Sequence, residues 1–152
     1  MTTPRYFEDF EAGQDLDLGS IEVTRDDIVE FATEFDPQDF HVSEEGGKAS
    51  MLGGLAASGW HTASIVMRLL ATNLFNKSSG RGSPGVSRLK WKHPVFPGDV
   101  LSASAKILAT KELRSKPLLG MVFIKITAIN QNGTEVIEWE NPVLFEKQEA
   151  SE

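Results

Sequence analysis

The chain has 152 residues, of which 40% are hydrophobic and 24% charged, a composition that suits one soluble domain with a single core. Its formal net charge of -7 argues against nucleic acid as the main partner, because phosphate contacts need clustered cations. The absence of cysteine excludes disulfides and thiol catalysis. Neither a signal peptide nor a membrane-length apolar run is visible, so we expect a cytoplasmic protein.

The first predicted elements are a short strand over residues 16–23 and a helix that follows it. Thr24 is of a residue type that favours the helix N-cap. Apolar side chains then recur at the spacing that places them on one helical face, and they are Ile28, Phe31, Ala32 and Phe35. Because Pro37 disfavours helical geometry at the residue before it, the helix should end near Phe35 and leave Asp36 at the start of a loop.

A second predicted helix covers residues 59–75, with Ser58 as its N-cap. A narrow polar stripe runs along it at helical spacing, formed by His61, Ser64, Arg68 and Thr72. Most of the remaining positions are apolar or small. A helix of this kind must be covered on most of its sides by other parts of the fold.

The second half of the chain supplies that cover, since it reads as a series of half-buried antiparallel strands. Apolar and polar residues alternate with period two around Leu89 and Trp91 and again over 101–109, 122–128 and 137–145. Asn132-Gly133 is a strong hairpin signal. We therefore expect an α+β domain over residues 1–146, a curved antiparallel sheet wrapped around the 59–75 helix, and a disordered tail over 147–152.

Two segments carry candidate chemistry. Asp36 and His41 lie five residues apart on the predicted loop, so both side chains can address one water molecule and exchange a proton with it. The start of the second helix offers free amides at Gly59 and Trp60 and the positive end of the helix dipole, which suit negative charge developing on a carbonyl oxygen. Local chemistry alone leaves an ordinary polar turn and a simple helix cap as open alternatives.

The sequence resembles the MaoC-like dehydratases, which include the (R)-specific enoyl-CoA hydratases of the hot-dog fold. The resemblance covers nearly the whole chain, through "YFEDFEAGQ", "FATEFDPQDFHVSEE", "LAASGWHTA" and "LKWKHPVFPGDVL". It implies that Asp36 and His41 activate the water that adds to a trans-2-enoyl thioester. It further implies that the Gly59 amide polarises the thioester carbonyl and that Ser58 helps to fix the site.

Gln38 stands where many family members have asparagine, and we expect it to complete the substrate-binding set together with Trp60. Pro37 before the amide also departs from the family pattern. A further departure is "GGK" at 46–48, where an alanine-rich turn is more usual. These differences from the family pattern bear on the identity of the substrate more than on the type of reaction.

The resemblance also implies a homodimer and a reversible hydration that forms a (R)-3-hydroxyacyl-CoA, with no cofactor beyond the CoA that the substrate carries. Two other functions stay open. Other hot-dog proteins are thioesterases, in which a carboxylate directs water to the carbonyl carbon. A non-catalytic acyl-CoA-binding domain would use the same pocket without turnover.

The remaining charged residues have less specific interpretations. A local basic cluster is formed by Arg81, Arg88, Lys90 and Lys92. It is either a solvated strand face or a site for the CoA phosphates, for which Arg81 and Arg88 are the candidates. His61 is expected at a surface or an interface and His93 in a structural role. The spacing of the three histidines does not fit common zinc motifs, so we expect no metal.

Overall fold

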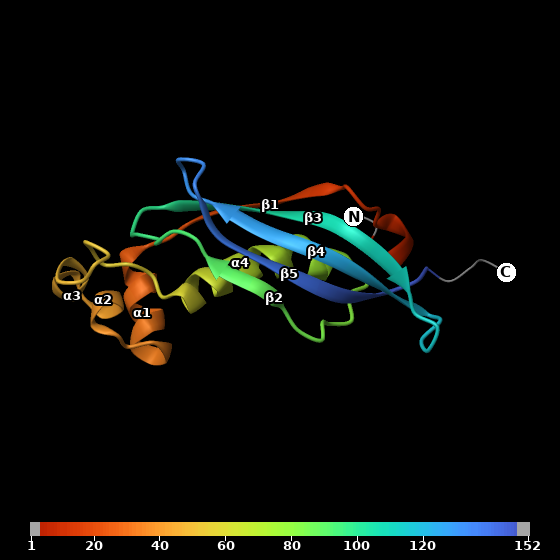
Figure 1. The fold of residues 1–152 in the computed structure, drawn as a ribbon, viewed down its shortest axis with the longest axis horizontal. Coiled ribbons are helices and arrows are strands. Elements are labelled where there is room, and N and C mark those ends of the chain that lie inside the picture. The colour runs from red at the N-terminus through yellow and green to blue at the C-terminus, as the bar shows by residue number, and fades with distance from the viewer. Residues whose placement is uncertain (1–3, 149–152) are drawn as a thin grey trace.

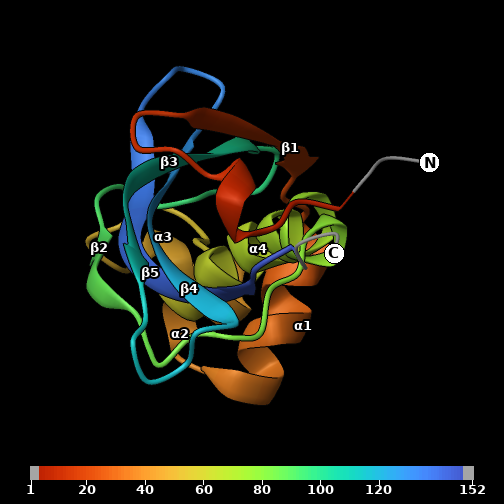
Figure 2. The same ribbon diagram turned by 90° about the vertical axis from the view of Figure 1, so that its right-hand side faces the viewer.

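The computed structural model describes residues 4–148 and shows one curved antiparallel sheet around a central helix (Figures 1 and 2). The sheet has five strands in the order β1-β3-β4-β5-β2. Their bounds are β1 Asp15–Glu22, β2 Ser87–Trp91, β3 Val100–Glu112, β4 Leu119–Ile129 and β5 Glu135–Glu146. The helix that the sheet covers is α4, Gly59–Asn73. The predicted α+β architecture is confirmed.

The core lies between α4 and the concave face of β3, β4 and β5. Alternate residues of β4 are buried, as the period-two pattern predicts for a strand with one covered face. On the helix, Val66 and Leu70 are fully buried. The facing strands contribute the small side chains of Ala105 and Ala128, both 0% exposed. Small residues at these positions let the sheet curve closely over the helix.

Three helices gather at the end of the molecule where α4 begins (Figure 1), namely α1 Arg25–Phe35, α2 Asp39–Val42 and α3 Glu44–Lys48. Thr24 caps α1 as predicted, since its hydroxyl accepts the amide hydrogen of Asp27 at 3.2 Å. The helix ends at Phe35, also as predicted. Two single-turn 3-10 helices, Phe7–Asp9 and Phe75–Lys77, complete the chain order.

Several predicted details are wrong. The segment from Asp36 to His41 is not a loop throughout, because His41 lies on the short helix α2. The apolar face of α1 is only partly buried. Ile28 and Ala32 are 0% exposed, whereas Phe35 is 66% exposed. Within the described residues, the one aromatic ring that packs against Phe35 is that of Phe31. An isolated heptad pattern does not reveal that the last turn of α1 projects beyond the core.

The ends of two other segments also differ from the prediction. Helix α4 stops at Asn73 rather than at position 75, and the Asn73 amide donates to the carbonyl of Leu18 on β1 at 2.6 Å. The predicted disordered tail starts at Lys147, yet Lys147 donates its backbone N–H to Leu118 and Gln148 donates its own to Glu8. Residues 149–152 lie outside the described residues.

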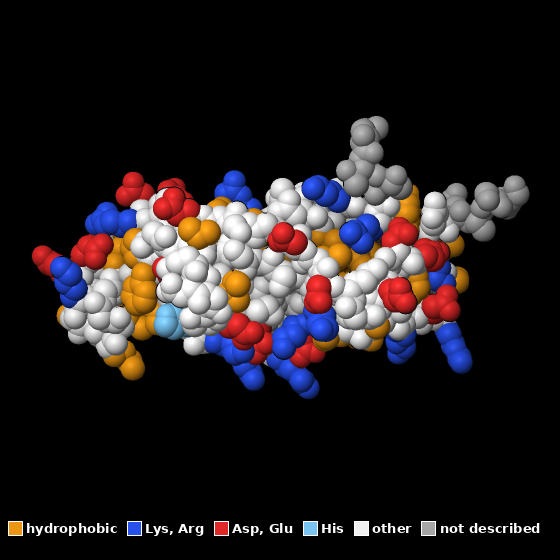
Figure 3. Space-filling view, turned by 90° about the horizontal axis from the view of Figure 1, so that it is seen from above, with side chains coloured by type: hydrophobic (Ala, Val, Ile, Leu, Met, Phe, Trp, Pro, Cys, Tyr) orange, Lys and Arg blue, Asp and Glu red, His pale blue; other side chains and the backbone are white. Residues whose placement is uncertain are grey.

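Charged side chains of both signs lie side by side on the face shown in Figure 3 rather than in separate fields. Among residues 4–148, no helix is long and apolar enough to cross a membrane.

Candidate active site

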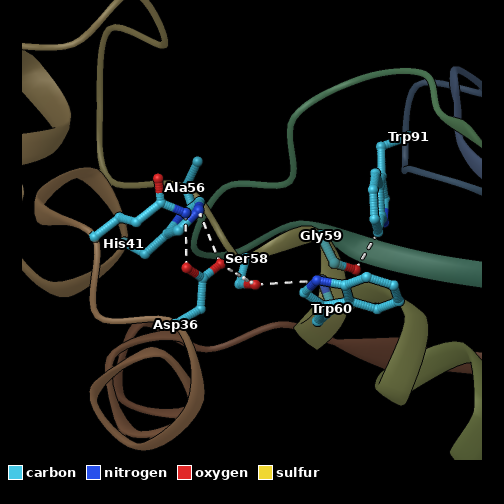
Figure 4. Close-up of polar contacts among 8 residues, drawn as sticks. Asp36, His41, Ala56, Ser58, Gly59, Trp60 and Trp91 are labelled. Atoms are coloured by element: carbon cyan, nitrogen blue, oxygen red, sulfur yellow. Dashed lines mark hydrogen bonds and ion pairs between the residues drawn. The ribbon is translucent and has the colours of Figure 1, made fainter.

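The site is built around Asp36 and His41, which two neighbouring helices bring together. Asp36 follows the last turn of α1, where its amide still donates to the carbonyl of Ala32 at 2.8 Å. His41 lies on α2 and is 6% exposed. The fold places His41 Nε2 3.6 Å from Asp36 Oδ2, and Figure 4 shows the two side chains facing each other. The predicted pairing of these two residues is therefore present in the structure.

The hydrogen bond at the far side of the ring fixes the tautomer of His41. Its Nδ1 lies 2.6 Å from the carbonyl oxygen of Ala56. A carbonyl only accepts, so Nδ1 carries a hydrogen, and in its neutral form the ring presents a lone pair at Nε2. Two acceptors, Nε2 and the Asp36 carboxylate, thus face each other across a gap longer than a hydrogen bond. A water molecule beside this pair, within hydrogen-bond distance of both atoms, can donate one hydrogen to each of them.

Ser58 and Gln38 both hold the Asp36 carboxylate. The Ser58 hydroxyl, fully buried, donates to Asp36 Oδ2 at 2.6 Å, and the Gln38 amide donates to Oδ1 at 2.7 Å. The Ser58 hydrogen bond is the main cause that lowers the pKa of Asp36 below its ordinary value. Burial opposes it, and smaller lowering contributions come from the Gln38 hydrogen bond and from the positive charge of His41 when that ring is protonated. Asp36 is therefore kept ionised. Gln38, predicted as part of the substrate-binding set, thus contacts the Asp36 carboxylate and helps to orient it.

The start of α4 differs from the prediction in one respect. The amide of Trp60 is not free, because it donates to Ser58 Oγ at 3.2 Å. No acceptor for the Gly59 amide is found in the part of the chain that the structure describes. First-turn amides of a helix have no partner within the helix. The Gly59 N–H, at the first position of the helix, is thus available to meet an incoming oxygen.

The close approach of Trp91 also requires glycine at position 59. A Cβ on Gly59 would lie 2.5 Å from Cε2 and 2.7 Å from Nε1 of Trp91. The indole of Trp91 therefore lies flat against the α-carbon, and its Nε1–H donates to the Gly59 carbonyl at 2.8 Å (Figure 4). Sequence reasoning did not find this role for Trp91. The one sequence signal at Trp91 is its alternation with basic residues, and this pattern predicts a partly covered strand position without indicating a contact with Gly59.

The structure also explains why the sequence departs from the family pattern at Gly46–Lys48. A Cβ on Gly46 would run into the backbone of Asp39 on α2, and one on Gly47 would run into the backbone between Gly54 and Leu55. Helix α3 therefore packs backbone to backbone against the two segments that precede His41 and Ser58. Glycine is required wherever two backbones approach so closely.

The sequence predicts His61 at a surface or an interface, but the fold buries it. It is 7% exposed and its ring stacks on Phe31 of α1, with ring centroids 4.9 Å apart and an interplanar angle of 14°. Within residues 4–148 its Nδ1 has no hydrogen-bond partner. Burial lowers the pKa of His61, against a smaller opposing effect of Asp27. The other residues of the predicted polar stripe are exposed, as are His93 and Trp60.

Three of the four residues in the basic cluster, all except Lys90, are paired with acids of β5 within the described range. Arg81 binds Glu146 with an N–O distance of 2.6 Å, and Arg88 lies 3.3 Å from Glu140. Lys92 contacts two further acids, Glu135 and Glu138. The predicted single face of the strand is interrupted, because Arg88 has φ 54° and the pairing register shifts between positions 87 and 90. These contacts favour the interpretation of the cluster as a solvated strand face, its charges balanced by acids of β5, over a site for the CoA phosphates.

A cavity of about 230 Å³ opens beside Gly59, between the start of α4 and the segment that follows β2. Ala56, whose carbonyl holds His41, also lines this cavity. Among the described residues, no group of three His, Asp or Glu side chains converges as a metal site would require.

Comparison with known proteins gives a consistent result. The family model described as "MaoC like domain" matches residues 9–125. A solved structure of a MaoC-like dehydratase from Rhodospirillum rubrum superposes with a TM-score of 0.90 at 37% identity, over 95% of this chain and 99% of that one. The uncharacterised protein YdeM of Bacillus subtilis is 31% identical over 140 residues, which are 92% of this chain and 98% of that protein.

Two further matches are more limited. Mesaconyl-CoA hydratase from Cereibacter sphaeroides is 31% identical over 67 residues, which are 44% of this chain but only 19% of that protein. A Mycobacterium tuberculosis protein with a double hot-dog fold superposes with a TM-score of 0.84 at 14% identity, over 100% of this chain and 47% of that one. The second likeness shows that the fold around α4 is the hot-dog fold.

Proposed function

Because the chain belongs to the MaoC-like domain family, we propose that it is a hydratase or dehydratase that adds water reversibly to a trans-2-enoyl-CoA and forms a (R)-3-hydroxyacyl-CoA. The observation that carries the proposal is the gap of 3.6 Å between two acceptors, Asp36 Oδ2 and His41 Nε2, beside the start of α4. The partial similarity to a mesaconyl-CoA hydratase supports the same class of reaction.

The two acceptors have different roles in the proposed reaction. Both hold the water, which places its oxygen lone pair toward C3 of the substrate. Because the Ser58 hydrogen bond lowers the pKa of Asp36, its carboxylate is a weaker base than that of an ordinary aspartate, and we assign it to orientation of the water. His41 Nε2 takes a proton from the water as the oxygen bonds to C3. Asp36 orients the water and stabilises the imidazolium that forms.

The other half of the reaction takes place at the thioester. When the oxygen bonds to C3, the electrons of the double bond move toward the thioester and form an enolate. The Gly59 N–H, at the positive end of the α4 dipole, donates to the enolate oxygen. A proton then returns from His41 to C2, so the net change is addition of one water molecule. The reverse sequence removes water from the hydroxyacyl thioester.

We further propose that the protein forms a homodimer through β2. Strand β2 is an edge of the sheet, where an unpaired strand exposes backbone donors and acceptors to a second copy. Large apolar side chains lie exposed beside this edge, and they are Trp60, Met67, Val86 and Trp91. Pairing of two β2 strands would cover both the edge and this apolar surface.

Incubation with crotonyl-CoA tests the proposed reaction. We expect loss of the enoyl absorbance without release of free thiol, whereas a thioesterase releases thiol. Asp36→Asn should lower kcat by about 10²–10⁴-fold without unfolding the protein, because a neutral amide no longer stabilises the imidazolium that forms when His41 takes the proton. Circular dichroism of the variant serves as the control. Full activity in a folded Asp36→Asn protein contradicts the mechanism.

A further inference from the structure

Trp91, the last residue of β2, crosses from the sheet to the start of α4 (Figure 4). Its Nε1–H donates to the Gly59 carbonyl at 2.8 Å, and the ring lies flat on the Gly59 α-carbon. The ring of Trp60 meets it edge-on, with centroids 5.0 Å apart and an interplanar angle of 85°. The indole is thus held in one orientation although Trp91 is 46% exposed.

The indole is also a wall of the cavity beside Gly59. Most of the other lining residues are apolar or small, and they include Leu52, Ala56, Ala57, Pro94 and Val95. The volume of about 230 Å³ is below the roughly 300–1,000 Å³ of pockets that enclose drug-sized ligands. The cavity therefore suits a small apolar group.

The cavity lies next to two groups that the proposed reaction uses. Gly59, whose amide is assigned to the thioester oxygen, lines the cavity together with Trp91. Ala56 lines it as well, and its carbonyl holds His41 at 2.6 Å. An acyl chain whose carbonyl is bound at Gly59 therefore starts at this cavity, and a longer chain needs the volume that the indole fills.

Resting on the proposed function, we propose that Trp91 sets the upper length of the acyl group, and that its indole restricts the protein to short-chain enoyl thioesters such as crotonyl-CoA. The residue acts on specificity and takes no part in proton transfer. Substitution by a smaller side chain should change the preference among acyl chains.

The test compares the wild type with Trp91→Ala on crotonyl-CoA and trans-2-octenoyl-CoA. We expect the ratio of kcat/KM for octenoyl to that for crotonyl thioester to rise at least about tenfold in the variant, because one methylene in an apolar pocket changes this parameter by roughly 10–200-fold. Trp91→Phe, which keeps a ring and loses the N–H, should retain the preference for crotonyl-CoA. Trp91→Leu provides an intermediate volume if the alanine variant does not fold.

Leu89→Ala is the matched control, because Leu89 lies two positions earlier on β2 and is not among the residues that line the cavity. An unchanged ratio in folded Trp91→Ala and Trp91→Leu overturns the proposal while the hydratase function stands. Dissociation constants of the unreactive butyryl-CoA and octanoyl-CoA measure chain preference without turnover. If the wild type binds them but hydrates no enoyl-CoA, the proposed function fails and the ratio of the two constants still decides the role of Trp91. If the wild type binds neither, both proposals fail.

Discussion

Ser58→Ala removes one hydroxyl group that serves the fold and the site at once. Ser58 is 0% exposed, accepts the amide of Trp60 as the N-cap of α4, and donates to Asp36 Oδ2 at 2.6 Å. Loss of an N-cap costs about 0.5–2 kcal/mol, and loss of a hydrogen bond to a charged group costs about 1.5–3 kcal/mol. We expect Ser58→Ala to lower the free energy of unfolding by roughly 2–5 kcal/mol at neutral pH.

The pH dependence separates the two contributions. The Ser58 hydrogen bond is the largest cause of the lowered pKa of Asp36. A carboxylate whose pKa is lower in the folded chain than in the unfolded chain contributes stability above the unfolded value, about 3.9. That contribution is lost as the pH falls through the folded-state pKa. The difference between wild type and Ser58→Ala should therefore be largest near neutrality and shrink in acid toward the cap contribution alone.

Urea denaturation between pH 7 and pH 3 measures this difference. Thr24→Ala is the matched control, because Thr24 caps α1 through the amide of Asp27 and is not among the residues that contact Asp36. We expect the control to lose about 1 kcal/mol with little dependence on pH. Equal losses in the two variants, with the same pH dependence, would refute the assignment of Ser58 to the Asp36 carboxylate.

Three further predictions follow from single contacts. His61→Phe should keep the stacking on Phe31. Its stability relative to wild type should rise by up to about 1 kcal/mol as the pH falls from 7.5 to 5.5, because the buried ring of His61 has a lowered pKa and gains its proton only on unfolding. A difference in chemical denaturation that stays constant across this range would contradict this reasoning. Gly59→Ala should destabilise by about 1–3 kcal/mol through the contact with Trp91, whereas Gly54→Ala, with only a contact of 3.9 Å to Phe96, should be nearly neutral in a thermal melt. Arg81→Ala should leave KM for crotonyl-CoA unchanged, because Arg81 is paired with Glu146. A severalfold rise in KM that weakens in salt, with kcat unchanged, would instead assign Arg81 to the CoA phosphates.

Much of the fold follows from local patterns. The period-two segments become β3, β4 and β5, and the hydrophobic central helix becomes the element that they cover. Caps at Thr24 and Ser58 mark the starts of α1 and α4. Each of these signals depends on neighbours in sequence and on one covered face. The exposure of Phe35 and the end of α4 depend on where distant segments lie, which no local pattern contains.

The site is predicted less completely than the fold. The pairing of Asp36 with His41 and the cap at Ser58 agree with the structure. The carbonyl of Ala56, which sets the tautomer of His41, has no side-chain signature. The burial of His61 has no local signal, because it comes from α1, which covers one end of the otherwise exposed polar stripe of α4.

The central claim is that the water held by Asp36 and His41 bonds to C3 of an enoyl thioester. Reaction with crotonyl-CoA in water enriched in the heavy oxygen isotope, followed by mass spectrometry, measures this directly. We predict a single heavy oxygen in an intact 3-hydroxybutyryl-CoA, lost from the product profile when folded Asp36→Asn replaces the wild type. Heavy oxygen in the carboxylate of free crotonic acid, with release of CoA, would contradict the account and show that the water attacks the carbonyl carbon.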